Sequence, residues 1–450
     1  MAEHHYPELA RLTLSGRSPS EGDSLSHPKT HLSGTRLLTA LVFVACSPTL
    51  VSAPSLTAPE EPPTTLLSTT APTAPSAFIA ADGSGDGSTA TNPADLTQLD
   101  ALIAQAGPGA TIELAAGVYN VDLPVALSNG GAHGAPVTIR GPATGPGPVF
   151  QGTRADPYDP LAEPGKPLFR LNAGADHLAF AGFTCQNVGN GCFLVAAPIT
   201  DLSITRITAT NVRRFFENAA ADGGPDATIN GLSISNVVVR GFSKGAIRLA
   251  YDTHDVSIAD VLGDSLQYDG DNFAIGVHLI DSVHDVVIER VTMNNARDTI
   301  HDYWNGDGFA AEPDVYNLTF VETTASGNTD AGYDIKATNV HMVNVEASDN
   351  KRNFRFWGAN TVLDGCFGAN PNLRGGTGTQ VQVHVVDQAD VRLVGCTFVD
   401  SDEDTIVFQV EGDAHLSVRD TEVARAAASV LSRVEPAARI ELLELVEQTS

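Results

Sequence analysis

One short pattern occurs three times in the C-terminal half of the chain. The copies occupy residues 307–312, 331–336 and 352–357, and they read DGFAAE, AGYDIK and RNFRFW. Their central aromatic residues are almost evenly spaced: Phe309, Tyr333 and Phe354. A repeat of this length made of strand-like segments predicts a solenoid, in which each repeat packs mainly on its neighbours. The residues that differ between the copies are charged or aromatic, which indicates a site.

Strand-like segments also recur along the chain from about residue 170. They begin near Leu202, Leu232, Val256, Val286, Leu318, Val340, Val362, Val391 and Leu416. The segments between them are rich in Gly, Asn, Asp and Ala. A doubly wound α/β fold would need helices there, and an antiparallel sandwich would need regular hairpin turns. This pattern therefore favours a stack of parallel strands.

The region upstream has the apolar spacing of a helix over residues 94–106, which Gly107 and Pro108 end. This opening resembles the N-terminal cap and first coils of right-handed parallel β-helix proteins. We therefore predict an all-β fold, a right-handed single-stranded parallel β-helix (solenoid) with an N-terminal capping helix. We expect residues 423–446 to form a C-terminal cap, either a helix or a last strand. Asn residues follow several strands at similar offsets and predict a ladder of stacked amides: Asn211, Asn295, Asn328, Asn350 and Asn370.

The first part of the chain has the composition of an export signal and a tether. Residues 1–53 form a leader whose apolar run, Leu37–Ala45, is too short to span a membrane. The signal ends either at the small residues before Pro54 or, as in a lipoprotein, at Cys46. Residues 54–77 are a linker rich in Pro, Thr and Ser, and residues 78–450 are the β-helix domain with terminal caps. We expect a secreted, periplasmic or cell-surface protein that touches a membrane only through a lipid on Cys46.

Four cysteines lie in the β-helix region. Cys185 and Cys192 are close enough in sequence to close a small loop, and Cys366 and Cys396 each follow a Gly at the end of a strand. Export permits disulfides. Both pairs are therefore either bonded or buried as free thiols.

The chain carries 54 acidic and 26 basic residues, a net charge of −28. Such a surface repels nucleic acid and anionic membranes, so we expect no nucleic-acid partner. The excess of carboxylates serves either solubility or calcium binding.

The triple repeat predicts two rows of outward side chains, because side chains alternate along a strand. The first row is Ala310, Asp334 and Arg355, and the second is Glu312, Lys336 and Trp357. The candidate catalytic residues are Lys336, Arg352, Arg355, Asp334, Glu312 and Asp307, and the candidate calcium ligands are Asp307, Glu312 and Asp334. Exposed tryptophan beside charge suits stacking on sugar rings, and both tryptophans of the chain lie near the repeat. The candidate substrate-binding residues are Trp357, Trp304, Lys351, Arg214, Arg248, His278 and His301.

The segment 305–356 resembles the catalytic modules of mannuronan epimerases and, more broadly, the β-helix polysaccharide lyases. The Asp-Pro-His that the family has after the first Gly-Phe is replaced here by Ala310, Ala311 and Glu312, whereas Arg352 matches the family's later arginine. The resemblance implies action on an acidic polysaccharide. Both families begin by removing the proton next to a uronate carboxyl group, which needs a base, a partner for the carboxylate and a proton donor.

We predict a monomeric exported lyase that cleaves a uronate-containing polysaccharide by β-elimination. Lys336 would be the base and Arg352 and Arg355 would bind the carboxylate, although Glu312 beside Lys336 raises the lysine pKa unless a metal occupies the acid. The alternatives are a glycoside hydrolase that uses two carboxylates among Asp307, Glu312, Asp330 and Asp334, an epimerase, and a glycan-binding solenoid without catalysis.

Overall fold

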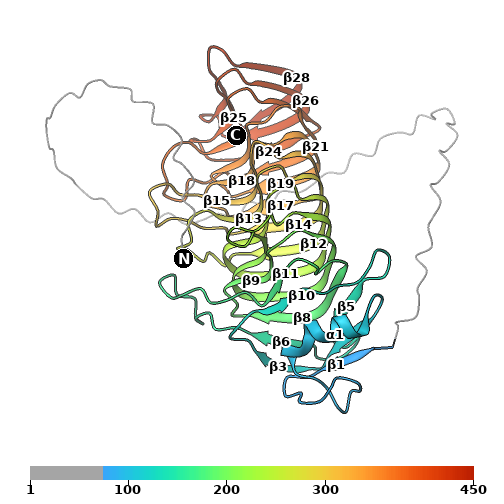
Figure 1. Cartoon of the computed structure of the whole chain (residues 1–450). Helices are drawn as coiled ribbons and strands as arrows, with labels where there is room; N and C mark the ends of the chain where they lie inside the picture. The colour runs from blue at the N-terminus through green and yellow to red at the C-terminus, as the bar shows by residue number, and fades with distance from the viewer. Residues whose placement is uncertain (1–73) are drawn as a thin grey trace, which may run out of the picture. The chain divides into compact units, whose positions relative to one another are not determined.

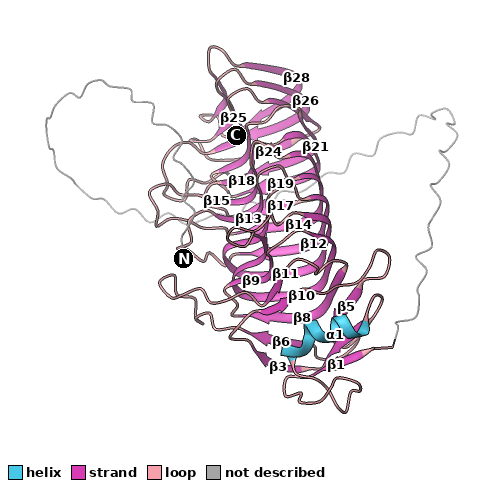
Figure 2. Ribbon diagram, viewed as in Figure 1, coloured by secondary structure: helices cyan, strands magenta, loops and turns pink. Residues whose placement is uncertain are grey.

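The computed structural model describes residues 74–450, which form one long stack of parallel strands with a single short α-helix (Figures 1 and 2). The predicted leader, Cys46 and most of the predicted linker lie outside the described residues. Within residues 74–450, no helix has the length and apolar character needed to cross a membrane.

The N-terminal end is covered by helix α1 (Leu99–Ala106), which follows a 3₁₀ turn, η1 (Leu96–Gln98). Asp95 caps the turn because its side chain accepts the N–H of Thr97 at 2.8 Å. The helix buries Leu99, Leu102 and Ile103 against the first coil, and Figure 2 shows it across that end of the stack. The predicted capping helix is therefore confirmed.

Nine strands build the first coils: β1 (Ala77–Ile79), β2 (Thr111–Leu114), β3 (Gly117–Asn120), β4 (Val125–Leu127), β5 (Val137–Arg140), β6 (Pro148–Gln151), β7 (Phe169–Leu171), β8 (Leu178–Gln186) and β9 (Asn190–Val195). The later coils each contain a long strand or strand pair: β10 (Ile199–Asn218), β11 (Ile229–Leu249), β12 (His254–Asp264), β14 (His284–Asn294), β16 (Tyr316–Val321) with β17 (Thr324–Ser326), β19 (Thr338–Ser348), β21 (Thr361–Ala369), β23 (Asp390–Val394) with β24 (Thr397–Val399), β26 (His415–Arg425) and β28 (Arg439–Thr449).

A further stack of short strands lies beside the long ones: β13 (Ala274–Leu279), β15 (Gly306–Ala311), β18 (Ala331–Ile335), β20 (Arg352–Phe356), β22 (Val381–Val385), β25 (Ile406–Val410) and β27 (Val430–Val434). The C-terminal parts of β10 and β11 extend this stack, which we call the site sheet. Its strands pair in parallel with the equivalent strands of the next coil. The predicted all-β parallel β-helix is confirmed.

A sharp corner in each long strand explains why Asn, Asp and Gly are frequent. At this corner each coil has one residue of positive φ, and register places these residues in a column: Gly182, Arg206, Asn236, Asp260, Arg290, Glu322, Asn344, Gly365, Gly395, Asp420 and Glu444. This left-handed conformation costs most residues about 1–2 kcal/mol, but Gly, Asn and Asp adopt it readily.

The aromatic residues of the triple repeat stack inside the solenoid. Phe309 pairs with Tyr333, and Tyr333 with Phe354, in adjacent strands. The ring centroids are 4.9 and 5.3 Å apart, and the planes differ by less than 10°. All three side chains are buried. The inward assignment of Phe309, Tyr333 and Phe354 is therefore correct. The residues that follow them, Ala310, Asp334 and Arg355, point to the opposite side of the strand.

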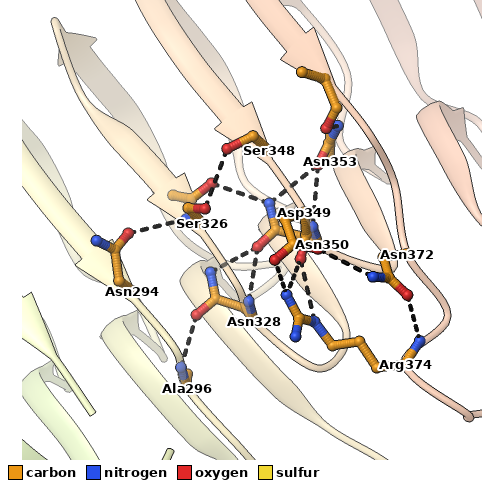
Figure 3. A network of polar contacts seen from close by, with 12 residues as sticks. Asn294, Ala296, Ser326, Asn328, Ser348, Asp349, Asn350, Asn353, Asn372 and Arg374 are labelled. Atoms are coloured by element: carbon orange, nitrogen blue, oxygen red, sulfur yellow. Dashed lines mark hydrogen bonds and ion pairs between the residues drawn. The ribbon is translucent and has the colours of Figure 1, made fainter. Parts of the chain in front are cut away.

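A buried amide ladder joins successive coils, as Figure 3 shows. Asn328 donates from Nδ2 to Oδ1 of Asn350 at 2.9 Å, and Asn350 donates to Oδ1 of Asn353 at 3.1 Å. Asn353 continues to Oε1 of Gln382 at 2.8 Å. The predicted ladder is correct for Asn328 and Asn350. Asn211, Asn295 and Asn370 occupy positive-φ turns. Asn211 also donates from Nδ2 to Oδ1 of Asn187 on the preceding coil, at 2.8 Å.

Both cysteine pairs are joined as disulfides, Cys185–Cys192 and Cys366–Cys396. The second bond links two successive coils, because Cys366 and Cys396 follow the corner residues Gly365 and Gly395. At the C-terminal end the last element is strand β28, which pairs with β26 and leaves Leu442, Leu443 and Val446 partly exposed. The expected C-terminal cap is thus a last strand and no helix.

Candidate functional site

The predicted outward row is continuous over seven coils of the site sheet. Register aligns, in order, Arg248, His278, Ala310, Asp334, Arg355, His384 and Gln409. The predicted order Ala310–Asp334–Arg355 is correct. Each residue of the second row, Glu312–Lys336–Trp357, directly follows a strand of the site sheet. The backbone N–H groups of Lys336 and Trp357 donate to the last residue of the preceding strand, which keeps the register.

Lys336 joins the two rows. Its Nζ lies 3.0 Å from Glu312 Oε1 and 3.0 Å from Asp334 Oδ2. Burial alone would lower the lysine pKa, but Asp334 and Glu312 outweigh burial and raise it. The pKa of Glu312 falls to about 2, because hydrogen bonds from His278 and Lys336 outweigh the effect of burial. Lys336 is therefore an ammonium group held between two carboxylates.

Asp330 is the centre of a second cluster. Its carboxylate accepts the Tyr303 hydroxyl at 2.7 Å and forms an ion pair with Arg352. Lys351 Nζ and an Arg355 nitrogen lie 3.7 and 3.6 Å away. Burial and the nearby Asp330 raise the pKa of Tyr303 to about 12, so this phenol is protonated at neutral pH.

Arg355 and Trp357 connect the two clusters. The guanidinium lies 4.2 Å from the centre of the Trp357 ring, and the indole N–H donates to Asp334 Oδ1 at 2.8 Å. The buried Nε atoms of Arg352 and Arg355 have no hydrogen-bond partner. Arg355 Nε lies 3.8 Å from Asp334 Oδ1, which is an ion-pair contact and too long for a hydrogen bond.

The loop between β14 and β15 contains a histidine–aspartate pair. Asp298 is completely buried, and its Oδ1 accepts the Nδ1–H of His301 at 2.5 Å. Its second oxygen accepts the Phe273 N–H at 3.1 Å. The other ring nitrogen of His301 is therefore the one that can take a proton. Two residues later in the same loop, Tyr303 reaches Asp330.

Several predicted substrate-binding residues are engaged with the protein. Lys351 is 4% exposed beside Asp330, and Trp304 packs against the turn that contains Gly375 and Gly376. Arg214 pairs with Glu217 at 2.7 Å, and Arg248 donates to the Asn218 carbonyl at 2.9 Å. His278 lies 3.5 Å from Glu312 Oε1, and burial lowers its pKa. Arg248 and His278 are in the predicted row; Arg214 precedes it by three residues.

The three predicted calcium ligands are all engaged with other groups of the protein. Asp307 is 2% exposed, and its Oδ1 accepts the Ala331 N–H at 2.7 Å. Burial and the charges of Asp334 and Asp330 raise its pKa well above the usual range. Glu312 and Asp334 already share Lys336. Calcium needs six to eight oxygen ligands, so these residues do not fit it. At 2% exposure, Asp307 has almost no surface open to a polysaccharide, and we assign it no step.

Sequence reasoning missed four residues near the site: Asp298, Tyr303, His384 and Glu411. His384 follows Arg355 in the row, is 4% exposed and has a pKa lowered by burial to about 4. Its Nε2 lies 3.1 Å from Glu411 Oε2. The longer interval between β20 and β22 hid this register. The spacing of Asp298 and His301 was a visible signal, but only the fold brings their loop to the site sheet.

A hollow of about 690 Å³ adjoins Trp357 at the end of the site sheet. Turns from the following coils line it, including Asp387, Gly412 and Glu435. Trp357 thus ends the second row next to an open space that could take further units of a chain-like ligand.

No protein-family model and no curated protein matches the sequence. Solved structures do. The mannuronan C-5 epimerase AlgE6 A-module of Azotobacter vinelandii aligns with 83% of this chain and 100% of that chain, at 13% identity and a TM-score of 0.52. Gene product 12 of bacteriophage phi29 aligns with 82% of this chain and 57% of that chain, at 12% identity and a TM-score of 0.51. The pectate lyase Pel9A aligns with 83% and 77%, at 14% identity and a TM-score of 0.36. At these identities the likeness shows that the chain shares the parallel β-helix fold.

Proposed function

We propose that this protein is an exported lyase that cleaves a uronate-containing polysaccharide by β-elimination. One observation carries the proposal. In a chain with a net charge of −28, four cations (Lys336, Lys351, Arg352 and Arg355) gather on adjacent coils with the three carboxylates Glu312, Asp330 and Asp334. Cations gathered on one face of an acidic protein suit a bound carboxylate.

Lys336, Arg352 and Arg355 would hold the uronate carboxylate. The two guanidinium groups, whose side chains are 11% and 14% exposed, would donate to its oxygens, and the Lys336 ammonium can offset the negative charge that develops when the neighbouring proton leaves. The raised pKa of Lys336 opposes a role as the base. We therefore assign this lysine to charge stabilisation.

His301 is the better candidate for the base. The buried Asp298 orients its ring, as a carboxylate does for the histidine of a catalytic triad. In the proposed step Nε2 takes the proton next to the carboxyl group. The electron pair of that C–H bond then forms the new C=C bond and expels the glycosidic oxygen. The hydroxyl of Tyr303, with a pKa of about 12, supplies the proton to that oxygen.

A hydrolase fits these residues less well. Hydrolysis needs one accessible protonated carboxyl group and one accessible carboxylate. Asp307 has the raised pKa of an acid but is buried. The other three carboxylates are all bound to cations. Positive charge at the centre of the site favours elimination from a uronate.

Two features support export. The leader has the composition of a secretion signal, and the β-helix carries two disulfides, which persist in oxidising compartments.

The test is incubation of the full chain with a panel of uronate polysaccharides while ultraviolet absorbance and reducing ends are recorded together. Elimination raises both signals, because it forms a conjugated double bond at each cut. New reducing ends without absorbance mean hydrolysis and would overturn the proposal. His301→Ala should lower the elimination rate at least a hundredfold. His341→Ala is a matched control, because this exposed histidine also pairs with an aspartate, at 2.8 Å, but lies on another sheet.

A further inference from the structure

A second group of chemically active side chains lies away from the site sheet, where strands β12 and β14 begin. It consists of Asp252, His254 and His284. One ligand atom from each residue lies within 4.8 Å of the other two, and no other such trio occurs among residues 74–450. The two imidazole rings are stacked, with centroids 4.9 Å apart and planes 6° from parallel. Successive coils of the solenoid thus bring together residues that are thirty positions apart in sequence.

Hydrogen bonds define which nitrogen of each ring is free. His254 Nδ1 lies 2.8 Å from the backbone carbonyl of Asp252, and His284 Nδ1 lies 2.7 Å from Asp285 Oδ2. Carbonyl and carboxylate oxygens only accept, so both Nδ1 atoms carry the proton. Both Nε2 atoms therefore present a lone pair when the rings are neutral. Asp252 Oδ1 lies 3.4 Å from Nε2 of His284.

Asp285 is itself held by an exposed chain of amides. Asn360 donates to Asn339 at 2.7 Å, Asn339 to Asn317 at 3.3 Å, and Asn317 to Asp285 Oδ1 at 3.0 Å. These residues belong to a second column of positive-φ turns. Metal-binding histidines usually donate their other N–H to a carboxylate or carbonyl that fixes the ring. Here His254 has the carbonyl of Asp252 and His284 has the carboxylate of Asp285, which Asn317 holds in turn.

From this arrangement we propose that Asp252, His254 and His284 bind a divalent transition metal such as Zn²⁺. Two imidazole nitrogens and one carboxylate suit Zn²⁺, Co²⁺ or Ni²⁺, whereas Ca²⁺ and Mg²⁺ prefer oxygen ligands. Ligand bonds of about 2.1 Å require the three atoms to move closer. Asp252 can do so by rotation, because its side chain is 64% exposed. The two parallel rings must also tilt toward one another, because a metal lies near the plane of each imidazole that binds it. The metal would link the coil of β12 to that of β14.

The three residues leave part of the coordination sphere open. Zinc in proteins usually has four ligands, and sites with three protein ligands keep a position for water or a small molecule. The site is independent of the proposed lyase chemistry. His254 and His284 lie on the long strands, Asp252 lies in the turn before β12, and none of the three belongs to the site sheet.

The test is calorimetric titration of the metal-stripped full chain with Zn²⁺, supported by the visible spectrum of the Co²⁺ form. We expect one Zn²⁺ site, and either His284→Ala or His254→Ala should abolish it. The same variants should lose the visible bands of tetrahedral Co²⁺. Asp285→Asn keeps a residue that tolerates positive φ and should weaken binding about tenfold. His341→Ala should leave binding unchanged, because this exposed histidine pairs with Asp364 and has no neighbouring imidazole.

Binding that persists at full strength in His284→Ala would overturn the proposal, and would place the ion elsewhere, for instance on the adjacent His4 and His5 of the leader. Absence of any binding in the unaltered chain at millimolar Zn²⁺ would overturn it as well. Circular dichroism of each variant shows whether the β-helix is intact, so that loss of binding can be separated from loss of fold.

Discussion

Lys336 allows a direct test of how the site handles charge. A base must lose its proton, whereas a residue that holds a carboxylate needs only its positive charge. Arginine keeps the charge but does not deprotonate in proteins. If Lys336 stabilises charge, Lys336→Arg should keep a tenth or more of the elimination rate, and Lys336→Met should lose about a hundredfold.

The structure sets the size of the expected loss. Nζ is 3.0 Å from each of two carboxylates, and we take about 4 Å for its distance to the carboxylate of the substrate. At that distance and an effective dielectric constant of about 20, the attraction is about 4 kcal/mol. The side chain is 24% exposed, so water screening reduces this to about 3 kcal/mol. That energy corresponds to a factor of about 10² in rate.

The assay is the initial rate of ultraviolet absorbance increase between pH 5 and pH 10, for the unaltered protein and both variants. Because Asp334 and Glu312 raise the pKa of Lys336, this group should add no rise in rate with pH over that range. Two results together would refute the reasoning. One is a folded Lys336→Arg protein as inactive as Lys336→Met, and the other is a rate that climbs tenfold per pH unit up to pH 10.

Three further predictions concern the base and the stability of the coils. Asp298→Asn should lower the elimination rate while leaving KM nearly unchanged, since Asp298 only orients His301; an equal rise in KM would contradict this role. The pKa of Glu312 is lowered to about 2, so its stabilising effect is complete above about pH 4.5 and disappears as the pH falls through 2. The difference in urea midpoint between Glu312→Gln and the unaltered protein should therefore shrink below pH 4.5, and a constant difference would disprove the linkage. Asn350→Ala removes a buried member of the amide ladder and should cost about 2–4 kcal/mol of unfolding free energy. Asn372→Ala, in an exposed turn, should cost under about 1 kcal/mol, and similar thermal melts for the two variants would show that the ladder adds little.

The sequence predictions were accurate where the repeat is regular. Phe309, Tyr333 and Phe354 were correctly placed inside, because apolar periodicity reports directly on burial in a solenoid. The row Ala310–Asp334–Arg355 then followed from strand alternation. Where coil lengths change, the register could not be read, and His384 was missed although it continues the same row.

The chemical state of the site was less predictable. Asp307 aligns with the other charged residues in sequence. As the second residue of β15 it is nevertheless buried, and burial raises its pKa. Its backbone partner comes from the next coil. Such cross-coil contacts depend on side-chain directions at strand ends, which alternation alone does not specify.

The sequence by itself determined the parallel solenoid, its capping helix and the sheet that carries the charged rows. These features arise from local periodicity and from turn residues that accept positive φ, and both can be read within one repeat. Only the tertiary structure decided which groups meet across coils. It placed Asp334 against Lys336 in addition to the predicted Glu312, set the Asp298–His301 pair beside Phe273 at the edge of the site sheet, and stacked His254 on His284. The pKa values and metal-binding capacity of these groups depend on separations of a few ångströms between residues of neighbouring coils or of one loop, which coil length and strand twist set together.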